Sequence, residues 1–231
     1  TTNLPLNTIA EVLDGFGLAA SATLIDAELE DGAAIPGQSD KVYSLTAYYE
    51  RNGFEVGYIF DDNAKVENFM GRKVHSVYNL ELLNANPIII SIGDNKVRKA
   101  IHDKFKLNLA PPLVHPSAII SPSVSIGNGT VIMPNAVVNA AVSIGKNCII
   151  NTAAVVEHDC VVHDYVHISP KAALAGGATI KEGTHVGINA TIIQSVCIGF
   201  WSTIGAGAVV TQDIPDHCTA VGIPAKPIKF H

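Results

Sequence analysis

The second half of the chain carries an aliphatic residue at every sixth position from Ile120 to Val210. These positions are Ile120, Ile126, Ile132, Val138, Ile144, Ile150, Val156, Val162, Ile168, Leu174, Ile180, Val186, Ile192, Ile198, Ile204 and Val210. A small or slim residue, such as Ala136 or Ser202, lies two positions before each of them. An α-helix repeats every 3.6 residues and a β-strand every two, so neither element explains a period of six. The period predicts a triangular solenoid of hexapeptide repeats, in which three strands and their turns make one coil of about 18 residues.

Two further features of the repeat lead to predictions about its turns and its end. A glycine directly follows the aliphatic position at five places, which predicts turns with unusual backbone angles. These are Gly127, Gly145, Gly187, Gly199 and Gly205. The spacing stops after Thr211, and residues 214–227 are predicted to form an irregular tail that covers the open end of the solenoid.

The residues before the repeat favour a small mixed α/β unit with a Rossmann-like parallel sheet. Apolar segments predict strands at 54–60, 72–77 and 88–92, and helices are predicted at 40–51, 80–83 and 96–105. Pro111, Pro112 and Pro116 mark a boundary. We therefore expect an α/β domain over residues 1–110, of which 1–40 carry no clear pattern, and a β-solenoid with its C-terminal cap over 111–231.

Composition narrows the possible partners of the chain. The net charge of -6 and the pI of about 5.8 argue against a broad nucleic-acid or anionic-membrane surface. No apolar run of about 18 residues and no basic-then-apolar leader is found, so a cytoplasmic location is expected. Cys148 and Cys160 occupy the small inward position of the repeat, whereas Cys197 and Cys218 complete no zinc-binding spacing. Neither a disulfide framework nor a structural metal is predicted.

Four histidines cluster in the central coils, at positions 158, 163, 167 and 185. His167 and His185 are separated in sequence by the length of one predicted coil, so we expect them to stack in neighbouring coils. His158 has Ala140 one coil below it and Gly176 one coil above it, which predicts an open slot at its level.

The chemistry of His158 has three interpretations. Glu157 and Asp159 flank it, and a carboxylate that orients one ring nitrogen leaves the other free to act as a general base. The plainer alternative is a solvated Glu-His-Asp turn. A zinc ion shared between subunits is the third possibility, because the spacing of five between His158 and His163 suits two of three ligands.

Several segments resemble a known family. They are Asn151-Thr152-Ala153-Ala154-Val155-Val156-Glu157-His158-Asp159-Cys160, His167-Ile168-Ser169, Gly187-Ile188-Asn189-Ala190 and Val221-Gly222-Ile223-Pro224-Ala225-Lys226. The resemblance is to the sialic-acid O-acetyltransferases and UDP-4-amino-sugar N-acetyltransferases of the bacillosamine type, which are hexapeptide-repeat acyltransferases. It covers roughly residues 54–227 and implies a left-handed parallel β-helix.

The resemblance also implies a homotrimer with active sites between adjacent solenoids and acetyl-CoA along the groove. His158 would take a proton from the sugar amine, and Asp159 would orient it. His167 would face the thioester, and the backbone of Gly176 would meet the developing oxyanion. The remaining cofactor-binding residues implied are Gly187, Ala206, Gly207, Ile223, Pro224 and Lys226.

In the N-terminal domain, the family binds the uridine nucleotide through an acidic pair and an Ile-Gly-Asp-Asn turn. The substrate-binding residues implied here are Asp61, Asp62, Gly93, Asn95 and Arg98. The Gly-rich first turn of the family is replaced by Ala-Ile-Pro-Gly-Gln-Ser at residues 34–39. Either nucleotide binding is altered, or the segment 1–40 is rearranged relative to the family.

The sequence therefore favours an acetyl-CoA-dependent N-acetyltransferase that acts on a nucleotide-linked amino sugar by direct transfer, without a bound metal. A sugar or sialic-acid O-acetyltransferase is the nearest alternative, because a histidine base serves an amine and a hydroxyl alike. A non-catalytic trimeric scaffold remains open, since a solenoid alone defines no function. A metal-dependent hydratase is the reaction that the zinc interpretation would imply.

Overall fold

A computed structural model of the protein describes residues 57–61, 66–69 and 72–231. The chain divides into two compact units, Thr1–Asn108 and Leu109–His231. The predicted helix at 40–51, the altered turn at 34–39 and Asp62 lie outside the described residues. No helix in the described part of the chain is long and apolar enough to cross a membrane.

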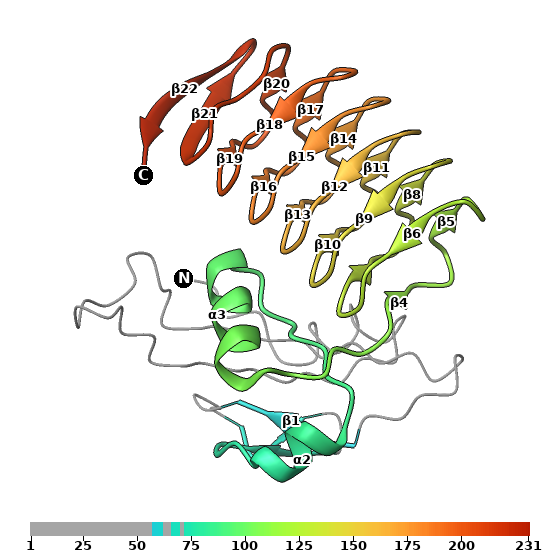
Figure 1. The fold of residues 1–231 in the computed structure, drawn as a ribbon, viewed down its shortest axis with the longest axis vertical. Helices are drawn as coiled ribbons and strands as arrows, with labels where there is room; N and C mark the ends of the chain where they lie inside the picture. Colours follow the sequence, from blue (N-terminus) through green and yellow to red (C-terminus); the bar gives the residue numbers. More distant parts are fainter. Residues whose placement is uncertain (1–56, 62–65, 70–71) are drawn as a thin grey trace. The chain divides into compact units, whose positions relative to one another are not determined.

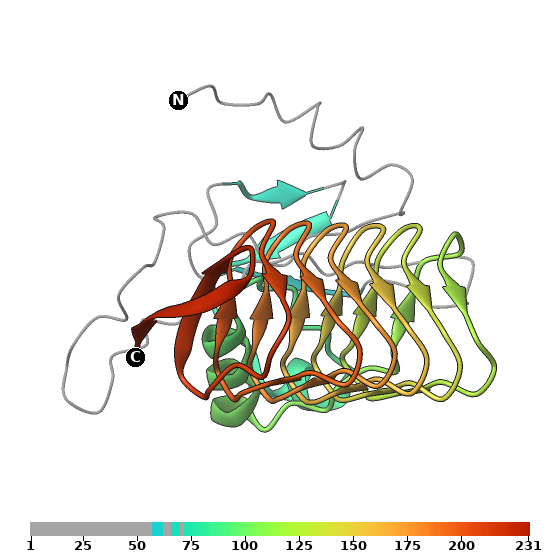
Figure 2. The same ribbon diagram turned by 90° about the horizontal axis from the view of Figure 1, so that it is seen from above.

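The second unit is a left-handed parallel β-helix whose coils are stacked one on another along a common axis (Figures 1 and 2). The predicted solenoid is therefore confirmed. Each coil contributes one short strand to each of three sheets, which we call the first, second and third face, and these strands pair in parallel with the exception of β22. The first face has the order β22-β21-β19-β16-β13-β10-β7-β4, the second β20-β17-β14-β11-β8-β5, and the third β18-β15-β12-β9-β6.

Most solenoid strands are very short, and each pairs with the strand one coil away on the same face, as Ile149 pairs with His167. On the first face the strands are β4 (Leu113–Val114), β7 (Val131–Ile132), β10 (Ile149–Ile150), β13 (His167–Ile168), β16 (His185–Val186), β19 (Thr203–Ile204), β21 (Cys218–Gly222) and β22 (Ala225–Phe230). On the second they are β5 (Ile119–Ile120), β8 (Val137–Val138), β11 (Val155–Val156), β14 (Ala173–Leu174), β17 (Thr191–Ile192) and β20 (Val209–Val210). On the third they are β6 (Ser125–Ile126), β9 (Ser143–Ile144), β12 (Val161–Val162), β15 (Thr179–Ile180) and β18 (Cys197–Ile198).

The aliphatic ladder fills the interior of the solenoid. The second residue of each strand points inward, and Ile132, Ile150, Ile168 and Leu174 are 0% exposed. The small residues predicted beside them, such as Ala154, are buried in the same core cluster. Burying one aliphatic side chain contributes about 1.5–3 kcal/mol, so each step of the ladder stabilises the solenoid by an amount of this order.

The corners of the coil have a left-handed backbone at every sixth residue from Gly129 to Gly207, with φ between +52° and +75°. Glycine, asparagine and aspartate adopt this conformation at low cost. They hold eight of these positions, which are Gly129, Asn135, Asn147, Asp159, Gly177, Gly183, Asn189 and Gly207.

The glycines that follow the aliphatic positions do not have these angles, so that prediction is wrong. They are required by close approach between coils instead. A Cβ on Gly127 would lie 2.6 Å from the carbonyl carbon of Gly145, and one on Gly187 would lie 2.5 Å from the carbonyl oxygen of Ile204.

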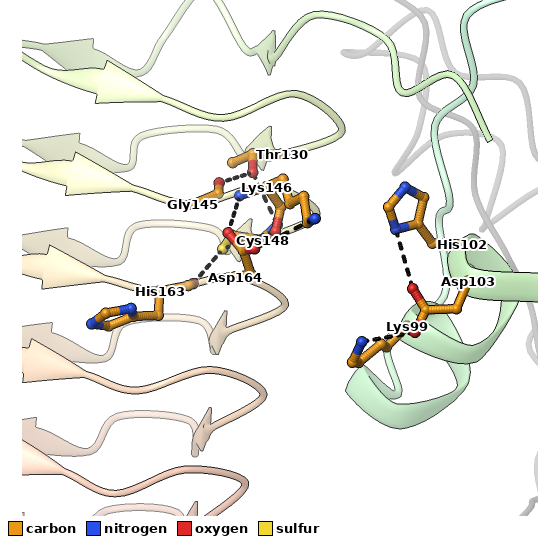
Figure 3. A network of polar contacts seen from close by, with 9 residues as sticks. All are labelled: Lys99, His102, Asp103, Thr130, Gly145, Lys146, Cys148, His163 and Asp164. Atoms are coloured by element: carbon orange, nitrogen blue, oxygen red, sulfur yellow. Dashed lines mark hydrogen bonds and ion pairs between the residues drawn. The ribbon is translucent and has the colours of Figure 1, made fainter. Parts of the chain in front are cut away.

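Polar side chains also join successive coils at the corner between the third and first faces (Figure 3). The Thr130 hydroxyl donates to the carbonyl oxygen of Gly145 over 2.8 Å and accepts from the Cys148 N–H over 2.9 Å. One coil on, the Asp164 carboxylate accepts from the Lys146 N–H over 2.9 Å. These bonds satisfy backbone groups that the corner leaves outside the strands.

The C-terminal tail was predicted to be irregular, but it forms a hairpin. β21 continues the first face in parallel with β19, and β22 returns antiparallel to β21. Cys218 and Ala220 of β21 are buried and belong to the core cluster of the solenoid. The tail therefore extends the core by a regular strand.

The described part of the first unit contains a small mixed sheet and two helices. Its strands are β1 (Ile59–Phe60), β2 (Asn68–Phe69) and β3 (Arg72–His75), and its helices are α2 (Leu80–Ala85) and α3 (Asn95–Phe105). β3 pairs in parallel with β1 and antiparallel with β2, so the sheet is not purely parallel as predicted. The predicted helices at 80–83 and 96–105 and the strand at 72–77 are confirmed.

Residues 88–92 form no strand among the described residues, contrary to prediction. Ile88 makes one bridge, in which its N–H donates to the Asn108 carbonyl over 2.7 Å. Ile89, Ile90 and Ile92 are nevertheless buried. The apolar run thus predicted burial correctly, but burial does not require strand pairing.

Candidate functional site

His158 and Asp159 form the corner between β11 on the second face and β12 on the third. Asp159 occupies the left-handed position of this corner, with φ +59°. Its N–H donates to the Ala140 carbonyl one coil below, over 3.0 Å, and the His158 carbonyl accepts from the Gly177 N–H one coil above, over 2.9 Å. The backbone of both residues is therefore fixed on each side, while their side chains are 63% and 66% exposed.

The two side chains form a hydrogen-bonded pair. His158 Nδ1 lies 2.8 Å from Asp159 Oδ2. Because a carboxylate only accepts, the imidazole donates from Nδ1, and in the neutral ring the lone pair lies on Nε2. No described residue hydrogen-bonds to Nε2. The pair therefore presents an oriented, unprotonated ring nitrogen to solvent, as a general base requires.

The pKa of His158 is raised above the ordinary value of a histidine. The hydrogen bond to Asp159 is the largest cause of this rise. Desolvation, the next largest effect, opposes it, and the charges of Asp159 and then Glu157 raise the pKa further. All three favourable causes stabilise the imidazolium. A raised pKa makes the neutral ring a stronger base, and it moves the loss of base function to a higher pH.

Gly176 lies directly against the His158 ring. A Cβ at Gly176 would be 2.6 Å from Cε1 and 2.7 Å from Nε2 of His158. The predicted open slot beside His158 is therefore filled by the imidazole itself. Only glycine at this position lets the ring lie across the next coil.

The backbone amide of Gly176 belongs to the residue against which the His158 ring lies. No residue that the structure describes accepts a hydrogen bond from its N–H. A backbone N–H that has no acceptor within the chain is the kind of donor that stabilises a developing oxyanion.

His167 and His185 stack on the first face, as their spacing predicted. Their ring centroids are 4.9 Å apart with an interplanar angle of 11°. Sequence reasoning missed their hydrogen-bond partners, Asn151 and Ser169, whose side chains lie 3.0 and 2.8 Å from Nε2 of His167 and His185, respectively. The sequence offset between partner and histidine is the same in both pairs, and it joins a corner of one coil to a strand of the next. That offset could have been found in the sequence once the coil length was assigned.

The other predicted cofactor residues lie at the corner between the first and second faces and in the C-terminal hairpin. Gly187 precedes β17, and Ala206 and Gly207 precede β20; the Gly207 N–H donates to the Ile188 carbonyl over 2.8 Å. In the hairpin, Ile223 and Pro224 form the turn between β21 and β22, and Lys226 lies in β22. All three hairpin residues are exposed.

One chain therefore does not gather the predicted site in one place. His158, Asp159 and Gly176 lie at the corner between the second and third faces. His167 lies on the first face, and Gly187, Ala206 and Gly207 lie at the corner between the first and second faces. The solenoid brings together the members of each group but separates the groups.

In the first unit, Arg98 is 1% exposed and acts on the turn before α3. Its guanidinium donates to the Ile92 carbonyl over 2.8 Å, to the Gly93 carbonyl over 3.3 Å and to Asn95 Oδ1 over 2.8 Å. Gly93 has nothing within 4 Å of the place where a Cβ would stand. Among the predicted substrate-binding residues, Arg98 and Asn95 therefore shape the turn, and Gly93 is its open position. Asp61 follows β1, and its N–H donates to the His75 carbonyl over 2.9 Å.

Within the described residues, no group of three or more histidines, cysteines, aspartates and glutamates is placed to hold a metal ion.

Comparison with known proteins identifies the family. A model of the PglD N-terminal domain matches residues 36–105. PerB from Caulobacter crescentus, solved in complex with CoA and GDP-perosamine, is 36% identical, with a TM-score of 0.72 over 78% of this chain and 88% of that one. The chain belongs to the hexapeptide-repeat sugar N-acetyltransferases.

Two further relatives support membership of this acyltransferase family. The acetyltransferase domain of PglB from Neisseria gonorrhoeae, in complex with acetyl coenzyme A, is 38% identical, with a TM-score of 0.67 over 74% of this chain and 87% of that one. UDP-N-acetylbacillosamine N-acetyltransferase of Bacillus subtilis is 49% identical over 47 residues, which are 20% of this chain. The curated relatives are matched over only 16% and 22% of their length.

We predict that Gly176→Ala in this sugar N-acetyltransferase lowers activity at least about tenfold, because the new Cβ displaces the His158 ring and a misplaced catalytic group is costly. Gly177→Ala is the matched control: it strains a left-handed position, but its Cβ meets only Ser195, at 3.4 Å and beyond. Steady-state kinetics and thermal unfolding of both variants are the measurements. Equal activity in the two variants would show that the contact between Gly176 and His158 is unimportant.

We also predict a pH effect of Asp159→Asn. The neutral amide can still accept from Nδ1, but it removes the charge that helps raise the pKa of His158. A base is lost as pH falls through its pKa, so the acidic limb of the kcat/KM profile should move to lower pH in the variant, together with a lower maximal rate.

Glu157→Gln is the control for the Asp159 variant. Glu157 contributes the smallest of the causes that raise the pKa of His158, so its removal should shift the acidic limb less. An unchanged limb in Asp159→Asn would show that another group governs the profile.

Proposed function

We propose that the protein transfers the acetyl group of acetyl-CoA to the amino group of a nucleotide-linked amino sugar, with His158 as the general base. The observation that carries this proposal is the hydrogen-bonded pair of His158 and Asp159 at an exposed corner, in which no described residue bonds to Nε2 and the ring lies against Gly176. The relatives support the substrates: PerB is solved with CoA and GDP-perosamine, and the PglB domain with acetyl coenzyme A. Two further structures of the Caulobacter crescentus enzyme carry alanine or asparagine in place of one histidine.

The chemistry follows from these groups. The amine nitrogen attacks the thioester carbonyl carbon, and His158 Nε2 accepts the proton that the nitrogen loses as the new C–N bond forms. The Gly176 N–H donates to the oxygen that becomes negative. When the C–S bond breaks, the imidazolium returns the proton to the thiolate. Asp159 stabilises the imidazolium between these steps, so no covalent enzyme intermediate is required.

The acceptor we favour is a 4-amino-dideoxy sugar linked to UDP, as in the bacillosamine-type members of the family. PerB binds a GDP-linked sugar, so both UDP-linked and GDP-linked acceptors are to be tested. Our candidate for part of the nucleotide site is the turn at Gly93, together with Asp61 and Asp62. Arg98 stabilises this turn by donating to its backbone carbonyl groups.

We further propose that the site is completed by a second copy of the chain in a homotrimer. In a cyclic assembly, one patch of each subunit meets a different patch of its neighbour. The separation of His158 from His167, Gly187 and Ala206 within one chain is what such a heterologous interface requires. Acetyl-CoA would lie along that interface, and the hairpin residues Ile223, Pro224 and Lys226 would line its distal end.

We predict that the protein releases CoA from acetyl-CoA only when an amino sugar linked to UDP or GDP is present, as measured with a thiol reagent and by mass spectrometry of the sugar. His158→Ala should reduce turnover by about 10^2 or more, since general base catalysis contributes about 10^2–10^4. His163→Ala, at a neighbouring histidine with no assigned role, is the control. Acetylation of a hydroxyl in an amine-free sugar would favour the O-acetyltransferase, and absence of transfer to every acceptor would favour the scaffold.

Mixed assembly tests the two-chain site. His158→Ala and His167→Ala chains should each be nearly inactive, but unfolding and refolding them together should restore activity, because some interfaces combine an intact His158 with an intact His167. Random mixing in equal amounts into cyclic trimers gives about a quarter of the wild-type number of sites. Mixing His158→Ala with the double variant should restore nothing. No recovery in the first mixture would contradict a site shared between chains.

A further inference from the structure

The first face holds a second imidazole that the proposed reaction leaves without a role. His185 of β16 is the register partner of His167 of β13, and the rings lie nearly parallel. The equivalent outward position is Ile149 in the coil below and Thr203 in the coil above. The stack therefore consists of two rings, between an aliphatic side chain and a short polar one.

Each ring is fixed by a side chain from a corner of the preceding coil. Asn151 bonds to Nε2 of His167, and Ser169, which is 5% exposed, bonds to Nε2 of His185. The corresponding corner residues in the adjacent coils are Met133 and Gly187, which offer no polar side-chain group for such a bond. The arrangement is thus confined to the two coils that carry the histidines.

The Asn151 contacts define the tautomer of His167. The Thr152 N–H can only donate, and it lies 2.8 Å from Asn151 Oδ1. The amide nitrogen of Asn151 is therefore the atom that faces His167, and it donates to Nε2. An imidazole that accepts at Nε2 carries its proton on Nδ1. This bond needs the ring to keep one orientation about its Cβ–Cγ bond.

We propose that His185 is a positioning residue for His167: its ring is the flat surface that holds the His167 ring in the plane required by the Asn151 bond. The inference rests on the proposed function, in which His167 belongs to the acetyl-transfer site. Without the stack, the His167 ring would rotate between orientations and spend less time with its proton on Nδ1. Ser169 positions His185 in the same way, through a hydroxyl that is itself buried.

The kinetic test uses three variants. His185→Ile replaces the ring by isoleucine, which already occupies the equivalent outward position at Ile149. We expect kcat to fall roughly 10- to 100-fold, because the His167 ring would no longer be held in its catalytic orientation. KM for acetyl-CoA should change little, because His185 is not proposed to touch it. His185→Phe restores a flat ring without a ring nitrogen, so kcat should recover most of the loss. Thr203→Val, at the next outward position, is the matched control and should behave as wild type.

A wild-type kcat in His185→Ile would overturn the proposal. A loss in His185→Ile that His185→Phe does not recover would also overturn it, because the flat ring would then not be the property that matters. Thermal unfolding and particle size, measured for all three variants, identify any effect of folding.

A second readout does not depend on catalysis. Nitrogen NMR of the His167 ring should show an unprotonated Nε2 and a protonated Nδ1 in the wild type and in His185→Phe. In His185→Ile the signals should shift towards the tautomer mixture of a free imidazole. If the wild type transfers no acetyl group, the proposed function fails while this measurement still decides the positioning role. Unchanged His167 nitrogen signals in His185→Ile would refute that role whatever the activity.

Discussion

The left-handed corner is the constraint on which the rest of the solenoid depends. A triangular coil closes only if the chain turns sharply three times, and it does so through a residue with positive φ in each hexapeptide. For residues other than glycine this conformation costs roughly 1–2 kcal/mol. The aliphatic side chain buried in the same hexapeptide contributes about 1.5–3 kcal/mol. One inward residue therefore offsets one strained corner, and this balance explains why the aliphatic rule is kept without exception while the corner residues vary from Asn135 to Trp201.

The same corner determines what a functional side chain can do. Asp159 occupies the left-handed position, and His158 directly precedes it. The backbone of these two residues is hydrogen-bonded to the coils below and above, and the His158 side chain projects outward from it. Gly176 stands at the equivalent place one coil on, where a side chain would collide with the ring. The proposed base, its orienting carboxylate and the proposed amide donor would thus come from two consecutive coils of the solenoid. Fixed placement of this kind is what general base catalysis of acyl transfer would require.

The period of six predicted the fold, the inward residues and the stack of His167 on His185, because all three depend only on the length of one coil. It did not predict what lies beside a residue in the next coil. The apparent slot at His158 is filled by its own ring, and Asn151 and Ser169 reach histidines of the following coil across a corner. These contacts depend on which way a side chain leans, which spacing does not define. In the first unit the apolar run at 88–92 indicated burial correctly, yet the single hydrogen bond of Ile88 to Asn108 shows that a buried run need not pair as a strand.

The two histidines of the proposed site hold their protons on the same nitrogen for opposite reasons. Asp159 accepts from Nδ1 of His158, and its charge stabilises the protonated ring, so this imidazole is suited to take up a second proton at Nε2. Asn151 donates to Nε2 of His167, and protonation there would place two donors against each other. In the proposed reaction the Asn151 bond would oppose a proton on Nε2 of His167, whereas His158 would take up and return one. In a site built from both residues, one histidine would exchange a proton and the other would not. The neighbour of the ring nitrogen would determine the role: the carboxylate of Asp159 for His158, and the amide of Asn151 for His167.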